Sequence, residues 1–293
     1  MKCGVRREVG EEGALMTELS DAVLIDTRYG PMWGLKTDAY ITRCLQTYGE
    51  YCEAETELFR QVVKPGMTVV EAGANIGVHS VMLAKACAPG RLLAFEPQQR
   101  AFQLLCANLT LADLTNVTAM PEALGADARF ARMPPTDYSV DGNFGQVSPF
   151  FTNRVADGGW ADGRTVRVTP LDALDLATLD FLKIDVEGWE TQVLQGARQT
   201  ILRCRPIIYV ENDRADQQSV LIDLMAELGY DQYWHVAPLF SAANFKGAQG
   251  DVTGKTASLN MFCPPKERGL QVTGFERIDP TNWTSPIKPI GAT

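Results

Sequence analysis

Short apolar runs alternate with amphipathic segments through the middle of the chain. The apolar runs cover residues 68–71, 92–95, 117–120, 179–184 and 206–210. Segments in which apolar residues recur at helical spacing cover residues 76–87, 98–111, 189–203 and 216–228. This alternation predicts an α/β fold with a parallel sheet and right-handed crossovers. Two further strand-like runs follow the last helix, at residues 232–237 and 257–263.

The segment before the first core strand is less regular. Residues 1–20 are charged and contain glycine, so we expect poor order there. Residues 21–25 are strand-like, and residues 29–34 are rich in turn-forming and aromatic residues. Residues 38–61 have helical spacing that breaks near Gly49. We therefore expect a short strand, a turn-rich stretch and an interrupted helix ahead of the core.

The most informative stretch, VVEAGANIGVHS at residues 69–80, joins the first core strand to the first core helix. Gly73 and Gly77 allow a tight turn and a close approach of the backbone to a ligand. The free N–H groups and dipole at the start of the helix favour a bound anion or carboxylate. The stretch lacks the dinucleotide motif G-x-G-x-x-G and the P-loop motif G-x-x-x-x-G-K-[ST], which disfavours NAD and FAD and excludes a P-loop. An ordinary strand-to-helix turn is the alternative.

A second signal stands at the end of the next apolar run. Glu96 follows the glycine turn by about twenty residues, the spacing of an acid that binds ribose hydroxyls at the end of the second strand. A carboxylate there accepts two hydrogen bonds from a vicinal diol. A helix cap at the surface is the alternative, because Pro97 suits a first helical position. Together the two signals favour a nucleoside ligand.

Three motifs now give the chain a resemblance to a known family. They are EAGANIG at residues 71–77, AFEP at residues 94–97 and KIDVEG at residues 183–188. With these motifs the chain resembles the FkbM family of S-adenosylmethionine-dependent methyltransferases over residues 48–264. The resemblance implies S-adenosylmethionine as cofactor and a Rossmann-like class I methyltransferase fold. That fold has a mostly parallel seven-stranded sheet with an antiparallel C-terminal edge hairpin.

The resemblance divides the chain into three parts. Residues 1–62 form an N-terminal extension and lid, and residues 63–264 form the methyltransferase domain. Residues 265–293 form a tail, which we expect to cover the surface without regular structure. The prolines from the end of the domain onward are Pro264, Pro265, Pro280, Pro286 and Pro289.

The lid interpretation concerns one segment of the N-terminal extension. Tyr51, Glu53 and Glu55 are similar to a family segment that precedes the first core strand, which implies a lid over the cofactor. The alternative is that these polar groups solvate an exposed helix.

The connection at residues 127–164 interrupts the domain. It contains several glycines and the aromatic residues Phe144, Phe150, Phe151 and Trp160. Connections this long are usually functional or disordered, and the aromatic residues argue against disorder. We expect a hairpin-like insertion at the carboxyl edge of the sheet that shapes the acceptor pocket and not cofactor affinity. A structural hairpin that covers a sheet edge is the alternative.

Ligands of open α/β sheets bind beyond the carboxyl ends of the strands. This rule gathers Glu71, Glu96, Glu122, Asp185, Glu187, Glu211 and Asn212 on one rim. Such a set of carboxylates suits a cationic sulfonium. In the resembled fold the adenine would lie at Glu122 and Ala123. The residues expected to bind the cofactor are Glu71, Gly73, Ala74, Asn75, Gly77, Glu96, Pro97, Glu122, Ala123 and Asp185.

The expected catalytic residues are Glu187, Asp185 and His79. The strand at residues 179–184 should end at its last residue, and both carboxylates should then share a side if the chain stays extended. One of them should have a raised pKa, so that it can accept a proton near neutral pH. We expect Asp185 to hold the methionine portion or sulfonium, and Glu187 to orient or deprotonate the acceptor. A cap on the helix that begins near Gly188 is the alternative.

The two histidines are weaker candidates. His79 lies beside the glycine turn and could act as a base near neutral pH, although a packing or hydrogen-bonding role is more frequent for such a histidine. His235 lies in an apolar strand pattern and is expected to be structural. No histidine–carboxylate spacing indicates zinc, and nothing in the acidic rim specifies Mg²⁺. The sequence therefore predicts no metal site.

These features favour methyl transfer from S-adenosylmethionine to a small-molecule acceptor, and the resemblance implies a hydroxyl of a sugar or secondary metabolite. One alternative is N-methylation of a peptide or amide, which needs no strong base. The other is a nucleoside-binding subunit without catalysis. Intact Gly73, Gly77 and Glu96 argue against lost cofactor binding but do not prove turnover.

Composition adds limits on partners and compartment. The net charge of −9 over 293 residues argues against a nucleic-acid-binding surface. The sequence has no run of eighteen apolar residues and no secretory signal pattern, so no membrane association is expected. The seven cysteines are scattered without a C-x-x-C pair, which disfavours a disulfide framework and makes the cytoplasm the expected compartment. A small-molecule acceptor is the expected partner, and homo-oligomerisation is left open.

Overall fold

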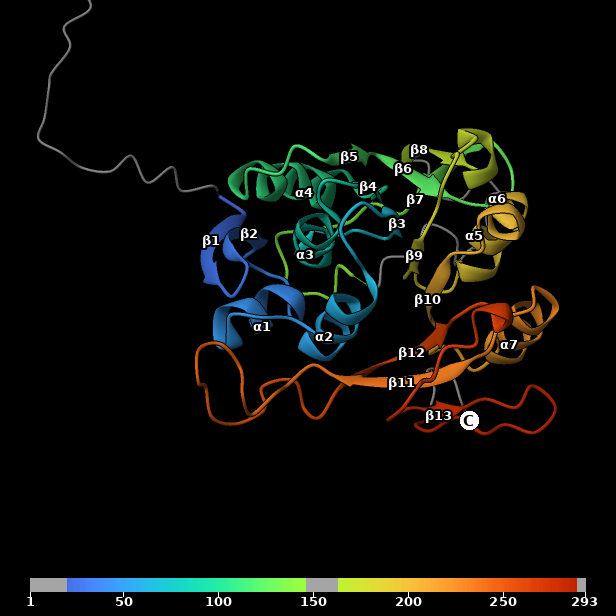
Figure 1. The fold of residues 1–293 in the computed structure, drawn as a ribbon. Coiled ribbons are helices and arrows are strands. Elements are labelled where there is room, and N and C mark those ends of the chain that lie inside the picture. The colour runs from blue at the N-terminus through green and yellow to red at the C-terminus, as the bar shows by residue number, and fades with distance from the viewer. Residues whose placement is uncertain (1–19, 146–162, 289–293) are drawn as a thin grey trace, which may run out of the picture.

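An eight-stranded sheet forms the centre of the structure, a computed structural model that describes residues 20–145 and 163–288 (Figure 1). The strand order is β13-β11-β12-β10-β9-β3-β4-β5. The bounds are β3 (Thr68–Ala72), β4 (Arg91–Phe95), β5 (Val117–Met120), β9 (Phe181–Ile184), β10 (Ile207–Glu211), β11 (Tyr233–Pro238), β12 (Ala257–Cys263) and β13 (Glu276–Arg277).

Strand direction divides this sheet into two parts. β5, β4, β3, β9 and β10 pair in parallel, whereas β12, β11 and β13 pair antiparallel at one edge. The predicted mostly parallel sheet with an antiparallel C-terminal edge hairpin is confirmed, and β13 adds a short strand to the seven expected. Every residue of β3, β9 and β10 is buried, because helices cover both faces of the parallel part.

Two hydrophobic clusters lie on opposite faces of the sheet. The core helices are α3 (Val78–Cys87), α4 (Gln99–Leu111), α5 (Glu190–Gly196), α6 (Arg198–Cys204) and α7 (Gln218–Glu227). Alternation along β3 sends Val69 to the cluster with α3 and α4, and Val70 and Ala72 to the cluster with α5, α6 and α7. Figure 1 shows these two groups of helices on either side of the strands.

The segment predicted as one helix at residues 189–203 is two helices. The chain leaves helical geometry at Ala197, with φ −108° and ψ 0°. The Asp172 carboxylate accepts hydrogen bonds from the backbone N–H groups of Gln199 (3.0 Å) and Thr200 (2.7 Å). A side chain from a distant segment therefore caps the start of α6. The helical spacing of residues 189–203 does not reveal this contact.

The N-terminal extension forms a hairpin followed by two helices. Its elements are β1 (Ala22–Thr27), β2 (Gly30–Leu35), α1 (Ile41–Tyr48) and α2 (Glu53–Val62). The predicted helix interruption is confirmed, since α1 ends at Tyr48 and Gly49 follows it with φ 71°. The prediction of a turn-rich stretch at residues 29–34 was wrong, because β2 pairs with β1. The Asn108 side chain also holds the Trp33 backbone, accepting from its N–H at 2.6 Å and donating to its carbonyl at 3.0 Å.

Strands at both ends of the insertion form a second, three-stranded sheet. They are β6 (Glu122–Leu124), β7 (Arg129–Met133) and β8 (Arg164–Thr169), and β7 pairs antiparallel with β8. The insertion is thus anchored like a hairpin at its base. The expectations for Phe150, Phe151 and Trp160 fall outside the described residues, as do those for residues 1–19 and Pro289.

The tail has more regular structure than predicted. A short 3-10 helix covers Lys266–Arg268, and β13 extends the sheet by pairing Tyr233 with Arg277. The prediction of an irregular tail was wrong for these residues. The backbone groups of β13 are satisfied by pairing with β11, and the local sequence of the tail does not indicate this pairing. Across residues 20–145 and 163–288, no helix is long and apolar enough to cross a membrane.

Candidate functional site

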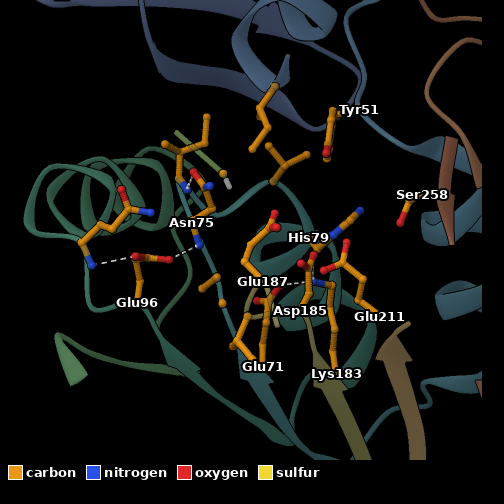
Figure 2. Close-up of a pocket in the computed structure, with 18 of the residues that line it drawn as sticks. Tyr51, Glu71, Asn75, His79, Glu96, Lys183, Asp185, Glu187, Glu211 and Ser258 are labelled. Carbon is orange, nitrogen blue, oxygen red and sulfur yellow. Dashed lines mark hydrogen bonds and ion pairs between the residues drawn. The ribbon is translucent and has the colours of Figure 1, made fainter. Parts of the chain in front are cut away.

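A cavity of about 210 Å³ opens at the carboxyl ends of the parallel strands (Figure 2). The strand-end acids that line it are Glu71, Glu96, Glu122, Asp185, Glu187 and Glu211. Because this edge collects the ends of neighbouring parallel strands, residues far apart in sequence meet there. Of the residues predicted to bind a cofactor, all but Gly77 line the cavity, and the three predicted catalytic residues line it as well.

The two glycines of the turn serve packing within the protein. Gly73 has φ +84°, and an added Cβ would lie 1.8 Å from the backbone oxygen of Asp185. Gly77 has φ +90°, and an added Cβ would lie 2.6 Å from the Leu105 side chain. The sequence attributed these glycines to ligand approach. In the structure the atoms that forbid a side chain belong to the protein, and Gly73 lines the cavity beside them.

Glu96 joins the glycine turn to the start of α4. Its Oε2 accepts from the Asn75 backbone N–H at 2.8 Å, and its Oε1 accepts from the Gln98 backbone N–H at 2.7 Å. Burial raises the pKa of Glu96 to about 7, although both hydrogen bonds oppose the shift. The alternative of a surface cap was wrong about exposure, because only 3% of Glu96 is exposed. The contact with Gln98 does, however, hold the beginning of α4.

A buried lysine lies beneath the acidic end of the cavity. Lys183 Nζ donates to Asp185 Oδ2 at 3.0 Å and lies 3.9 Å from Glu71 Oε1. Burial disfavours its charge, but Asp185 and Glu71 prevail and raise the pKa of Lys183. Glu71 also accepts a hydrogen bond from the Ser80 hydroxyl at 2.5 Å. Burial raises the pKa of Glu71 to about 7 despite these partners.

Sequence reasoning did not assign Lys183 to the site, although a signal was present. The strand at Phe181–Ile184 is apolar apart from this residue. Lysine is almost never fully buried without a partner. A lysine inside an apolar strand therefore indicates a buried carboxylate nearby.

Asp185, Glu187 and Glu211 bring one carboxylate oxygen each to within 4.8 Å of one another. β9 ends at Ile184 as predicted, but the chain then turns, with φ 58° at Glu187. The two predicted catalytic carboxylates therefore meet through a turn and not through an extended chain. Glu187 is also ion-paired with Arg214.

Burial and the charge of Asp185 raise the pKa of Glu187 to about 8, while Arg214 opposes the shift. The alternative of a capping role for Glu187 is wrong, because among the described residues the N-terminus of α5 at Trp189 has no side-chain cap. Glu190 instead holds the turn before α5, since its Oε1 accepts from the backbone N–H groups of Val186 (3.1 Å) and Gly188 (3.0 Å). Glu187 is thereby left to face the cavity.

His79 is a neutral group on the cavity wall. It is 6% exposed, and burial and the charge of Lys183 hold its pKa well below the ordinary value. Its Nε2 lies 4.0 Å from Glu55 Oε2 and has no hydrogen-bond partner among the described residues. His235 lies apart from the cavity and bonds the Tyr209 hydroxyl at 2.8 Å, in keeping with the structural role expected.

The wall opposite the strand ends comes from segments outside the parallel sheet. The N-terminal extension contributes Tyr40, Ile41, Tyr51 and Glu55, and the insertion contributes Asn143 and Gly145. The β11–β12 region contributes Leu239, Thr256, Ala257 and Ser258. Glu55 is 3% exposed, so the alternative of an exposed helix face is wrong for this residue. Glu53 does not line the cavity and pairs with Arg60 at 2.6 Å.

The end of the cavity at β6 is formed by Glu122, Ala123, Leu124 and Trp189. The Thr169 hydroxyl donates to Glu122 Oε2 at 2.5 Å. The cavity therefore has an end with mixed apolar and polar walls at β6 and an acidic end at β9 and β10. Glu96 and Asn75 form a third part of its lining.

Several known proteins are similar to this chain in sequence or in structure. Methyltransferase sdnD of Sordaria araneosa is 30% identical over 155 residues, which are 44% of this chain and 59% of that protein. The chain thus matches less than two thirds of that relative's length. A crystal structure of the methyltransferase FkbM from Methylobacillus flagellatus KT has 16% identity and a TM-score of 0.42, covering 71% of this chain and 50% of that one.

A S-adenosylmethionine-dependent methyltransferase from Agrobacterium tumefaciens has 14% identity and a TM-score of 0.45, covering 86% of this chain and 72% of that one. The family model described as methyltransferase FkbM domain matches residues 71–231. That segment is more than half of the chain and includes the glycine turn, Glu96 and the acidic strand ends. The chain therefore belongs to the FkbM family of methyltransferases, which implies S-adenosylmethionine as the methyl donor.

Proposed function

We propose that this protein methylates a hydroxyl oxygen of a small-molecule acceptor, such as a sugar or a secondary metabolite, with S-adenosylmethionine as donor. One observation carries the proposal. A single cavity joins a buried carboxylate suited to a ribose diol, Glu96, to an end where Asp185, Glu187 and Glu211 converge. The first part suits a nucleoside, and the second suits a cationic sulfonium and an acceptor that must lose a proton.

The residues of the cavity fit the donor. Each oxygen of Glu96 has one backbone partner, so each keeps a lone pair for a ribose hydroxyl. The apolar face of Trp189, with Ala123, suits an adenine ring. Asp185, held by Lys183, lies where a positive group is favoured. When bound, S-adenosylmethionine supplies an electrophilic methyl group on a sulfonium.

On the acceptor side, Glu187 orients the hydroxyl and takes its proton as the oxygen becomes methylated. Its ion pair with Arg214 fixes the direction of the carboxylate. His79, which is neutral, offers a second acceptor, because its buried Nε2 has no hydrogen-bond partner among the residues described here. The N-terminal segments around Tyr51 and Glu55 would act as a lid that keeps water from these groups.

Glu187→Gln tests this proposal, because it keeps the shape of the side chain and removes the proton acceptor. We expect turnover of a hydroxyl acceptor to fall at least about a hundredfold, the lower end of general-base contributions, with donor affinity within twofold. The measurement is release of S-adenosylhomocysteine across a panel of sugar, polyketide and amide acceptors. Glu57→Gln, on the exposed face of α2, is the matched control.

Two outcomes would replace the proposal. Full turnover of an amide or peptide acceptor by Glu187→Gln would favour N-methylation, which needs no strong base. Donor binding without product release for any acceptor in the panel would favour a nucleoside-binding subunit.

A further inference from the structure

We propose that Asp185, Glu187 and Glu211 bind a divalent metal ion at the acidic end of the cavity. The metal site itself is inferred from the positions of the three carboxylates. The role of the ion in activating the acceptor rests on the proposed function. The sequence alone predicted no metal site. Asp185 and Glu187 follow β9 whereas Glu211 ends β10, and the three residues share no recognisable spacing.

Strand pairing brings the three side chains together. β9 and β10 are parallel neighbours with Ile184 opposite Val210, so the residues that follow β9 lie beside the last residue of β10. One oxygen from each carboxylate lies within 4.8 Å of the other two, and Figure 2 shows the three side chains directed into one space. Oxygens that bind one side of an octahedral Mg²⁺ lie about 3 Å apart, so the ion would draw the three carboxylate oxygens closer together than they lie in this structure.

An independent observation at Glu211 points to a missing partner. This side chain is 9% exposed, and its Oε2 is buried without a hydrogen-bond partner among the described residues. Lys183 forms ion pairs with Asp185 and Glu71, and Arg214 forms ion pairs with Glu187 and Asp213. A buried carboxylate oxygen without a partner is costly, and a cation that contacts all three carboxylates would satisfy it.

The donor set selects the kind of ion. All three ligands are carboxylate oxygens, which suit Mg²⁺, Mn²⁺ or Ca²⁺ and not a soft metal. Three ligands from one side leave positions open toward the cavity, where water or an acceptor hydroxyl can bind. An ion there would orient an acceptor hydroxyl and make its proton easier to remove. An acceptor ammonium group would satisfy the same charges without a metal, which sets the competing outcome of the test.

Binding of Mn²⁺ alone is the direct test. The full chain, treated with chelator and then saturated with S-adenosylhomocysteine, is titrated with Mn²⁺ and followed by electron paramagnetic resonance and calorimetry. We expect one saturable Mn²⁺ per chain. Asp185→Asn and Glu211→Gln should each raise the Mn²⁺ dissociation constant at least tenfold. Glu57→Gln, an equal loss of charge on the exposed face of α2, should leave it within twofold.

Two results would overturn the inference. One is the absence of saturable Mn²⁺ binding in a wild-type chain that binds S-adenosylhomocysteine normally, which would favour an acceptor ammonium group. The other is unchanged Mn²⁺ affinity in both variants, with native circular dichroism confirming that they are folded. Loss of donor binding with Mn²⁺ binding retained would count against the proposed function alone, so the two proposals fail separately.

Discussion

Glu96 shows how one side chain can support both the fold and the site. Its two oxygens hold the backbone of Asn75 and Gln98, and its remaining lone pairs face the cavity. The position followed from its spacing after the glycine turn, whereas its burial did not. Lys183 and Glu190 were missed for a related reason. Their roles depend on which backbone and carboxylate groups the fold places beside them, and one sequence does not display those neighbours.

The affinity for S-adenosylmethionine should depend on the ionisation of Glu96. Because burial raises the pKa of Glu96 to about 7, the group is ionised above pH 7 and protonated below it. The ionised form accepts more hydrogen bonds from a diol, so affinity should be full above pH 8 and fall as the pH drops below 7. The limiting fall is about tenfold per pH unit for one proton.

Glu96→Gln should remove most of this pH dependence. At pH 8 it should weaken binding by about 1.5–3 kcal/mol, the range for hydrogen bonds to a charged group. Calorimetry at pH 6, 7 and 8 on both proteins measures the effect. If the affinity of the variant for S-adenosylmethionine fell equally with decreasing pH, the titrating group would be one other than Glu96.

At the scale of elements, the parallel strands were predictable because helices bury both of their faces. Continuous apolar runs such as residues 206–210 carry that signal directly. The break between α5 and α6 was not predictable, since the cap on α6 comes from Asp172 in a distant segment. β2 was missed in the same way, because its order depends on pairing with β1 and on the Asn108 side chain.

The contact between Gly73 and the backbone of Asp185 ties the end of β3 to the end of β9. Gly73→Ala should destabilise the protein, because its Cβ would lie 1.8 Å from the Asp185 oxygen and because φ is +84°. We expect a loss of about 3 kcal/mol, combining overpacking with the cost of a left-handed backbone. Gly66→Ala is the matched control, since φ is +90° and nothing lies within 4 Å of an added Cβ. It should cost only about 1 kcal/mol.

Urea unfolding of the two variants measures this difference. Equal losses at both positions would show that the backbone angle alone sets the requirement for glycine. Because Asp185 lies at the acidic end of the cavity, Gly73→Ala should also lower turnover in conditions where the protein remains folded.

At the scale of the whole molecule, three separate segments close the cavity. The Ala39 N–H donates to the Gly142 carbonyl at 2.9 Å, and the Gly142 N–H donates to the Thr37 carbonyl at 3.0 Å. The insertion therefore touches the N-terminal extension as well as the core. Sequence patterns indicated a lid and an insertion separately. Their mutual contact follows from chain topology, which local patterns do not encode.

These contacts change the expectation for the insertion, which the sequence assigned to acceptor choice and not to cofactor affinity. Asn143 and Gly145 line the cavity, and the Phe144 carbonyl accepts a hydrogen bond from the Gln98 side chain at 2.9 Å. The Phe144 ring is 6% exposed and packs 4.9 Å from the Tyr138 ring. The segment thus covers the part of the cavity that holds Glu96, and loosening it should weaken donor binding.

Phe144→Ala tests that conclusion, because it removes the buried ring and keeps the backbone carbonyl. If the closed arrangement then forms in about a tenth of the molecules, the dissociation constant for S-adenosylmethionine should rise about tenfold. Phe130→Ala is the matched control, since Phe130 lies on β7 in the same insertion and is 75% exposed. Calorimetry gives the two affinities, and hydrogen exchange of residues 37–42 and 138–145 reports whether both segments loosen together. If Phe144→Ala showed faster hydrogen exchange in these segments but unchanged affinity for S-adenosylmethionine, the conclusion would be wrong. The insertion would then act in acceptor choice alone, as its sequence suggests.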